Sequence, residues 1–330
     1  ITNWTGITMR SLLLSLLLLL SHALSAESGT VGEVTYPPIG VDMPLRQVSE
    51  HVYYVEGTPG AATDNEGFIS NAGFVVTGAG VVVFDALGSP SLASTMYEKI
   101  RAVTDEPIVR VIVSHYHADH IYGLQVFEDL DAEILAPAGA EEYLASDNAQ
   151  ERLEDRRFTL DPWVNETTRL VYPDKYLSEG TNFRLGDVEF IVTMVGAAHS
   201  DGDLTLFVEP DRVLFSGDVI FEGRVPFLGD ANTRHWLRVL ERMEREQLVA
   251  LVPGHGSVAA DPNAAVGLTR RYLAFLRKQM GSAVEDFIPF NEAYEATDWS
   301  DFEELPAFEE ANRRNAYQVY LSMEAEALGN

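Results

Sequence analysis

The 330-residue chain contains no cysteine, so disulfides cannot stabilise it and no thiolate can serve as a metal ligand or nucleophile. Positive charge is also scarce. Against 51 aspartates and glutamates there are 23 lysines and arginines, which gives a formal net charge of −28. Because such a surface repels phosphate backbones and anionic lipids, the composition argues against nucleic-acid binding.

Long apolar runs are missing except near the N-terminus. Arg10 precedes a leucine-rich stretch at 11–20, and small residues follow up to Ala26. This arrangement is typical of a secretory signal peptide, and the stretch is shorter than the about 20 residues that span a bilayer. We predict cleavage after Ala26, with Ala23 as the alternative. The mature protein is then expected in the periplasm or outside the cell, without a stable membrane anchor.

Three of the eight histidines lie in one run, His-Tyr-His-Ala-Asp-His at residues 115–120. The run follows β-branched residues at 108–113, which predict a strand that ends where the run begins. Neutral imidazole and carboxylate are ligands that zinc and other first-row divalent metals prefer. The run therefore predicts a metal site, and the alternative is a polar surface turn that is rich in histidine by chance.

Three further donors follow later predicted strands, each in a turn where glycine lets the backbone approach closely. They are His199 after the strand at 187–193, Asp218 after 212–215 and His255 after 248–252. Any one of them alone would be read as an ordinary loop residue. Their repeated placement at strand ends predicts that they complete the metal site.

Strand and helix patterns alternate in both halves of the chain. Strands are predicted at 51–55, 68–77, 81–85, 108–113, 133–135, 187–193, 204–208, 212–215 and 248–252, and helices at 89–103, 120–129, 233–246 and 262–280. Two such halves predict two β-sheets packed together with helices outside. We divide the chain into extra residues and a signal peptide at 1–26, a domain at 27–280 and a helical C-terminal extension at 281–330.

The motif His-x-His-x-Asp-His and the later donors resemble the metallo-β-lactamase-fold superfamily over about residues 52–256. The resemblance implies an α+β fold, an αββα sandwich of two mixed sheets, with a dinuclear site for two zinc ions at one edge. Iron or manganese are the alternative metals. By position, the first metal is bound by His115, His117 and His199, the second by Asp119, His120 and His255, and Asp218 bridges both. Asp85 matches a carboxylate that orients the ligands.

The implied activity is hydrolysis, in which a hydroxide bridging the metals attacks an ester, thioester, lactone or amide carbonyl. Asp119 would orient this water or accept its proton. Asp218 as the bridge is typical of glyoxalase II-like members, although the acidic C-terminal region disfavours glutathione as the substrate. Three alternatives stay open: a histidine-ligand metallo-β-lactamase, a mononuclear iron persulfide dioxygenase, and a non-catalytic metal-binding accessory. The dioxygenase does not need His120 and His255 as ligands.

Segments outside the metal motif resemble one exported subfamily, the quinoprotein relay system zinc metallohydrolases. They are 68–76, 85–90, 120–127 and 291–299. This resemblance implies a functional link to a periplasmic quinoprotein dehydrogenase, but it specifies no substrate.

The substrate is expected to be a small molecule that is held by loops over the metal site. Arg224 and Phe227 lie in the loop beyond Asp218, and Trp163 lies in a charged insertion at 151–168. Arg224 could hold an anionic group or serve as a salt-bridge partner. The insertion is either a lid over the site or a solvated surface excursion.

Overall fold

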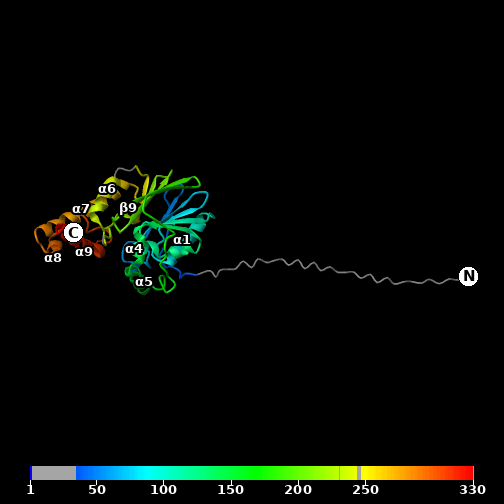
Figure 1. Cartoon of the computed structure of the whole chain (residues 1–330), viewed down its shortest axis with the longest axis horizontal. Helices are drawn as coiled ribbons and strands as arrows, with labels where there is room; N and C mark the ends of the chain where they lie inside the picture. The colour runs from blue at the N-terminus through cyan, green and yellow to red at the C-terminus, as the bar shows by residue number, and fades with distance from the viewer. Residues whose placement is uncertain (2–34, 230, 244–246, 330) are drawn as a thin grey trace. The chain divides into compact units, whose positions relative to one another are not determined.

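The computed structural model describes Ile1 and residues 35–229, 231–243 and 247–329. Its contacts divide the chain into a unit at 1–35 and a unit at 36–330, and all the described helices and strands lie in the second unit (Figure 1). Apart from Ile1, the predicted signal peptide lies outside the described residues. Within them, no helix combines the length and the apolar character needed to cross a membrane.

The first sheet has seven strands in sequential order, β1 to β7. They are β1 (Leu45–Gln47), β2 (Val52–Val55), β3 (Ala72–Val76), β4 (Val81–Phe84), β5 (Ile108–Ile112), β6 (Glu133–Pro137) and β7 (Lys175–Leu177). β1 to β4 pair antiparallel, and β4 to β7 pair parallel. Parallel neighbours need a crossover connection, and α1 (Pro90–Val103) supplies the one between β4 and β5.

The second sheet has five strands in the order β12-β11-β10-β9-β8. They are β8 (Thr181–Leu185), β9 (Val188–Gly196), β10 (Asp203–Glu209), β11 (Val213–Phe221) and β12 (Ala250–His255). β8 to β11 pair antiparallel, and β11 pairs parallel with β12. The helix α6 (Thr233–Met243) lies in the connection between these two parallel strands.

Side-chain alternation along β4 shows how the two sheets pack. Val82 and Phe84 join the apolar cluster between the sheets, where the Phe84 ring stacks on Phe215 of β11 at 5.2 Å between centroids. Val81 and Val83 point the other way, into a cluster that includes residues of α1. Because neighbouring residues of a strand face opposite sides, both faces of the sheet are buried. The predicted αββα sandwich of two mixed sheets with helices outside is confirmed.

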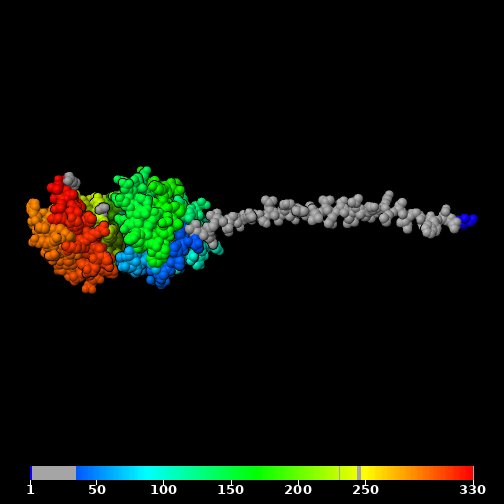
Figure 2. All heavy atoms as spheres, turned by 90° about the horizontal axis from the view of Figure 1, so that it is seen from below, coloured from blue at the N-terminus to red at the C-terminus, as the bar shows by residue number. Residues whose placement is uncertain are grey.

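The C-terminal helices α7 (Pro262–Glu285), α8 (Phe290–Ala296) and α9 (Phe308–Ala327) pack with α6 on the second sheet. Figure 2 shows them, coloured orange to red, gathered at one end of the unit. The buried Tyr272 hydroxyl of α7 donates to Asn312 Oδ1 of α9 at 2.8 Å. The predicted helical C-terminal region is confirmed. The boundary at 281 falls inside α7, and the division into domains stays a prediction.

Three predicted elements differ from the structure. The helix at 120–129 is two short helices, α2 (Ala118–Ile121) and α3 (Leu124–Glu128), because Gly123 packs tightly against the backbone of Ala86. β11 continues through Asp218 to Phe221, and β12 ends at His255, so both donors lie within strands rather than beyond them. Several elements were not foreseen: β1, β7, β8, a 3₁₀ turn at Ala62–Asp64, α4 (Gly139–Ala145) and α5 (Asp147–Thr159).

Candidate metal centre

Five histidines and two aspartates from both sheets and their connecting loops come together. The loop and helix after β5 provide His115, His117, Asp119 and His120, while the second sheet provides His199 after β9, Asp218 in β11 and His255 in β12. These residues form two groups, and within each group the donor atoms lie within 4.8 Å of one another. The structure therefore brings together all seven residues that the sequence singled out. Their role as metal ligands stays a prediction.

The first group has four donors. His117 Nδ1 lies 3.0 Å from His115 Nε2 and 2.9 Å from His199 Nε2. Asp218 Oδ2 lies 3.2 Å from His199 Nε2 and 3.9 Å from His115 Nε2. Three imidazole nitrogens and a carboxylate oxygen therefore face one small volume.

The second group shares Asp218 with the first. His255 Nε2 lies 3.2 Å from Asp119 Oδ2 and 3.3 Å from Asp218 Oδ2. His120 Nε2 lies 3.5 Å from Asp119 Oδ2 and 3.3 Å from Asp218 Oδ1. Because Asp218 reaches donors of both groups, its carboxylate occupies the position of a bridge between them.

Asp85 at the end of β4 fixes the orientation of two of these histidines. Its carboxylate accepts the backbone N–H of Ser114 at 2.7 Å and the Ser114 hydroxyl at 2.8 Å, and it lies 2.9 Å from His120 Nδ1. The same hydroxyl lies 2.9 Å from His115 Nδ1. Outer hydrogen bonds of this kind select the tautomer that presents Nε2 to a metal. Ser114 was not recognised from the sequence.

Asn71 fixes the loop that carries His255. Its side-chain amide donates to Pro253 O at 2.8 Å and to Gly256 O at 2.7 Å. The imidazole of His255 is oriented by Ile69 O, which lies 2.7 Å from Nδ1. Asn71 and His255 are far apart in the sequence, so nothing local indicated this role.

Asp203 fixes the loop that carries His199. Its Oδ2 accepts the backbone N–H groups of Ala198, His199 and Ser200 at 3.1, 2.8 and 3.0 Å. Burial raises the pKa of Asp203 to about 7, against the effect of these hydrogen bonds. In the sequence, Asp203 is marked only as an acidic residue shortly after His199. Acidic residues are common in loops, so this position alone does not indicate its role.

Close backbone packing at Gly254 leaves no room for a side chain behind Asp218. A Cβ atom at Gly254 would lie 2.0 Å from Asp218 Oδ1. Gly217 adopts a φ of 51°, and a Cβ atom there would lie 2.5 Å from the Ser114 Cβ. Glycine is therefore required at both positions for the strands to place the donors.

The carboxylates of the centre are ionised. Burial raises the pKa of Asp119, but His120 and His255 outweigh it and hold this pKa below its usual range. Burial also acts to raise the pKa of Asp218, and His255, His120 and His199 likewise bring it well below the usual value. In return, Asp218 and Asp119 raise the pKa of His120 against the effect of its burial.

Asp218 and Asp119 also raise the pKa of His255 against the effect of its burial, whereas the pKa values of the other three histidines are lowered. Burial lowers the pKa of His199 to about 3, and it lowers the pKa of His115 well below its usual value, with repulsion from His120 and His117 adding to the effect. Burial also lowers the pKa of His117. Neutral imidazole is the form that binds metal.

This donor set fits two divalent cations. Zinc binds imidazole nitrogen at about 2.0–2.1 Å, which places tetrahedral donors roughly 3.4 Å apart, and the donor separations in each group are close to this spacing. His120 Nε2 and Asp218 Oδ1 are buried without a hydrogen-bond partner. Buried polar atoms are rarely left unpaired, so a cation between them would satisfy both.

The three residues predicted to contact the substrate, Arg224, Phe227 and Trp163, differ in their burial and in their neighbours. Arg224 is buried, and Phe227 packs under the guanidinium of Arg314 at 5.2 Å. The indole of Trp163 donates to Pro38 O at 3.1 Å in an exposed hydrogen bond. Within the insertion, Arg156 of α5 lines a small cavity together with Asp119, so this helix borders the centre. Substrate binding by these residues stays a prediction.

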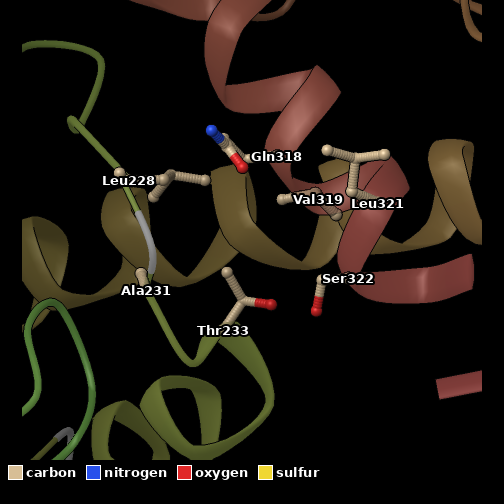
Figure 3. Close-up of a pocket in the computed structure, with 8 residues that line it drawn as sticks. Leu228, Ala231, Thr233, Gln318, Val319, Leu321 and Ser322 are labelled. Carbon is tan, nitrogen blue, oxygen red and sulfur yellow. The ribbon is translucent and has the colours of Figure 1, made fainter. Parts of the chain in front are cut away.

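A larger cavity, of about 290 Å³, is lined by residues other than the seven donors (Figure 3). Leu228, Gly229, Ala231 and Thr233 line one side, and Gln318, Val319, Leu321 and Ser322 of α9 line the other. Among the described residues that line it, none is charged and none is one of the seven donors, which separates it from the candidate centre.

The fold and the clustered donors define a class: αββα sandwiches with a metal site at the edge of two sheets. The family model described as "Metallo-beta-lactamase superfamily" matches residues 65–255, more than half of the chain. The chain therefore belongs to the metallo-beta-lactamase superfamily.

Two relatives of the chain have names that describe different activities. The acyl-coenzyme A thioesterase MBLAC2 of Gallus gallus is 32% identical over 156 residues, which are 44% of this chain and 55% of the relative. The chain thus spans about half the length of that thioesterase. The metallo-beta-lactamase IND-1 of Chryseobacterium indologenes is 22% identical over 210 residues, 62% of this chain and 77% of the relative.

Solved structures are similar in fold. The sec-alkylsulfatase Pisa1 from Pseudomonas sp. superposes with a TM-score of 0.65 at 17% identity, over 85% of this chain and 50% of that chain. A metallo-beta-lactamase from Pontibacter korlensis superposes with a TM-score of 0.56 at 17% identity, over 71% of this chain and 99% of that chain. At this identity the likeness establishes the fold alone.

Proposed function

We propose that this protein is an exported hydrolase that uses two zinc ions to cleave an ester, thioester, lactone or amide bond. The observation that carries the proposal is the pair of donor groups that share Asp218. A thioesterase and a β-lactamase among the relatives support it, because both names describe attack on a carbonyl group.

His115, His117, His199 and Asp218 would hold one ion, and Asp119, His120 and His255 would hold the other, with Asp218 shared between them. Two cations in such sites lower the pKa of water and polarise the carbonyl oxygen.

Asp119 would also act as the proton acceptor for the attacking water. Its side chain is 22% exposed, whereas that of Asp218 is 4% exposed, so of these two carboxylates Asp119 is the more open to an incoming water. Its pKa is held low by His120 and His255 despite burial, so it is an ionised acceptor at neutral pH. A positioned carboxylate can accept the proton directly or orient the water for attack.

Metal analysis of protein purified without chelator tests the metal assignment. We expect two zinc ions per chain. One iron ion per chain together with oxygen uptake on a persulfide would instead support the dioxygenase. A protein that binds two metals but cleaves none of a panel of esters, thioesters, lactones and β-lactams would support the non-catalytic accessory.

Replacement of Asp119 tests the mechanism. We expect Asp119→Ala to lower kcat/KM by roughly 10²–10⁴-fold or more, because both a donor and a proton acceptor are lost. Asp129→Ala is the matched control, since Asp129 is a surface carboxylate paired with Arg169. If Asp119→Ala retains full activity while zinc is bound, the proposed mechanism is wrong.

The proposal of export, and of a link to a quinoprotein dehydrogenase, rests on the N-terminal sequence and the subfamily segments. Mass spectrometry of the protein from a periplasmic fraction should give a mature N-terminus at Glu27, or at Leu24 if cleavage follows Ala23. An intact N-terminus in the cytoplasmic fraction would contradict export.

A further inference from the structure

Among the residues that the structure describes, none gives the His199 imidazole the hydrogen bond that orients other donor histidines. His115, His120 and His255 also turn Nε2 toward the centre, and each has a hydrogen-bond partner 2.7–2.9 Å from Nδ1. The Nδ1 atom of His199 is buried and unpaired. Asp203 fixes the backbone of His199, but backbone hydrogen bonds do not set the rotation of a side-chain ring. The orientation of this donor therefore depends on the side chains packed around it.

Two aromatic rings that are not metal donors pack against the His199 imidazole. Trp236 of α6 lies 5.6 Å from it between centroids, with the planes at 74°, and Phe221 of β11 lies 5.8 Å from it at 57°. These two rings are 6.4 Å apart, and both are fully buried. Phe221 also stacks on His255 at 5.2 Å, but His255 has its own hydrogen-bond partner in Ile69 O. Trp236 makes the nearly perpendicular contact that aromatic rings favour, and it is the group best placed to set the rotation of His199.

The indole of Trp236 is held in place by the strand that carries Asp218. Nε1 of the indole donates to Val219 O at 2.9 Å, one residue after Asp218 in β11. The neighbouring residue of α6, His235, has its Nε2 2.9 Å from Val195 O near the end of β9. The first turn of α6 therefore bonds the two strands that precede or contain donors of the first group. A fully buried ring in a close-packed interior has little freedom to change rotamer, so Trp236 presents a fixed surface.

We propose that Trp236 is a positioning residue for the first group of donors: its ring sets the rotation of the His199 imidazole, and its N–H holds β11 beside Asp218. Both effects present the donors in the geometry that a metal ion needs before the ion binds. Groups behind the ligands that fix their orientation raise the affinity for metal. This role rests on the proposed metal binding, and it assigns Trp236 to the ion that His115, His117, His199 and Asp218 would hold.

The zinc affinities of the full mature chain test this role. We expect Trp236→Leu to weaken the binding of one of the two zinc ions roughly 10–100-fold, because His199 loses the ring that fixes its rotation, and to leave the other ion within about threefold. Trp236→Phe keeps an aromatic ring but loses the N–H, so its affinity should fall between those of the wild type and Trp236→Leu. Competition with a chromophoric chelator measures both dissociation constants. His255→Ala removes a donor of the second group alone, and Trp236→Leu should still weaken the remaining ion in that background.

Trp299→Leu is the matched control for the loss of an indole. Trp299 Nε1 also donates to a backbone carbonyl, Tyr294 O at 3.1 Å. Its ring contacts are with Tyr294, Phe275 and Phe308 rather than with a donor histidine. We expect Trp299→Leu to leave both zinc affinities unchanged. Equal losses in Trp299→Leu and Trp236→Leu would show that general destabilisation is the cause, and they would overturn the proposal.

Cobalt in place of zinc gives a spectroscopic readout that a loss of stability alone would not move. The visible absorption bands of Co²⁺ depend on the geometry of its ligands. At saturating Co²⁺ we expect Trp236→Leu to change these bands relative to the wild type, whereas Trp299→Leu should leave them unchanged. If Trp236→Leu retains the zinc affinities or the cobalt spectrum of the wild type, Trp236 does not position His199. If the wild type itself binds no metal, the proposed function fails first and this role fails with it.

Discussion

Asp85 lies outside the two donor groups, yet two of the donor histidines are oriented through it. Its carboxylate lies 2.9 Å from His120 Nδ1 and bonds Ser114, whose hydroxyl lies 2.9 Å from His115 Nδ1. Asp85 also has a φ of 61°, a left-handed conformation that non-glycine residues adopt rarely. Strain of this kind persists when the surrounding contacts hold it, here at the edge of the centre.

We expect Asp85→Ala to weaken zinc binding by roughly 10–100-fold, because His120 loses the group that fixes its tautomer. Competition with a chromophoric chelator measures the affinity. Asp211→Ala is the matched control: Asp211 is also a carboxylate next to a histidine, His51 Nδ1 at 2.8 Å, but it lies outside the donor groups. Equal loss of zinc affinity in both variants would mean that general destabilisation, not ligand orientation, is the cause.

The sequence predicted the seven donors because four of them lie in one short run at 115–120, and the other three follow apolar runs in glycine-containing segments. It did not predict Ser114, Asn71 or Asp203, which are common polar residues. These residues act through hydrogen bonds to backbone groups or to the donor side chains. Asn71 bonds Pro253 and Gly256, which are far from it in the sequence. Such contacts depend on the finished fold, and no local pattern encodes them.

At the scale of elements, prediction succeeded where the signal is local. The apolar run of β4 is wholly buried and those of β2 and β5 are mostly so, and all three lie within one or two residues of the predicted bounds. Neither of the missed strands β7 and β8 contains a buried residue, so they lack the apolar pattern of a central strand. The single helix predicted at 120–129 is interrupted because the contact of Gly123 with Ala86 is a tertiary one.

Helix capping is a local signal whose energetic effect can be measured. Ser89 Oγ accepts the N–H of Leu92 at the start of α1, and Asp261 Oδ1 accepts that of Ala264 at the start of α7, both at 3.1 Å. We expect Ser89→Ala and Asp261→Ala each to lower the free energy of unfolding by about 1 kcal/mol in denaturant titrations. Ser146 precedes α5, but its side chain does not cap the helix. Ser146→Ala should therefore lower the free energy of unfolding by less than the other two substitutions. Equal losses at all three positions would contradict capping as the cause.

At the scale of the whole molecule, the candidate metal centre draws its donors from both sheets. The sheets pack through an apolar cluster, and the donors come from both of them: the loop after β5 belongs to the first, and β11 and β12 belong to the second. Without a disulfide in the chain, bound metal would be the strongest local connection between the sheets at this edge. A ligand that binds the folded state alone stabilises that state by mass action.

Chelation should therefore lower the melting temperature of the whole unit at 36–330, not only disturb the site. At free zinc one hundred times the dissociation constant, binding contributes about 2.7 kcal/mol. For a protein of this size that corresponds to a shift of roughly 5 °C or more in Tm, measured by calorimetry with and without chelator. Asp218→Ala, which removes the shared donor, should have a Tm that responds much less to chelator. If the wild type shows no shift, or if the variant shows the same shift, the metals do not join the sheets through these residues.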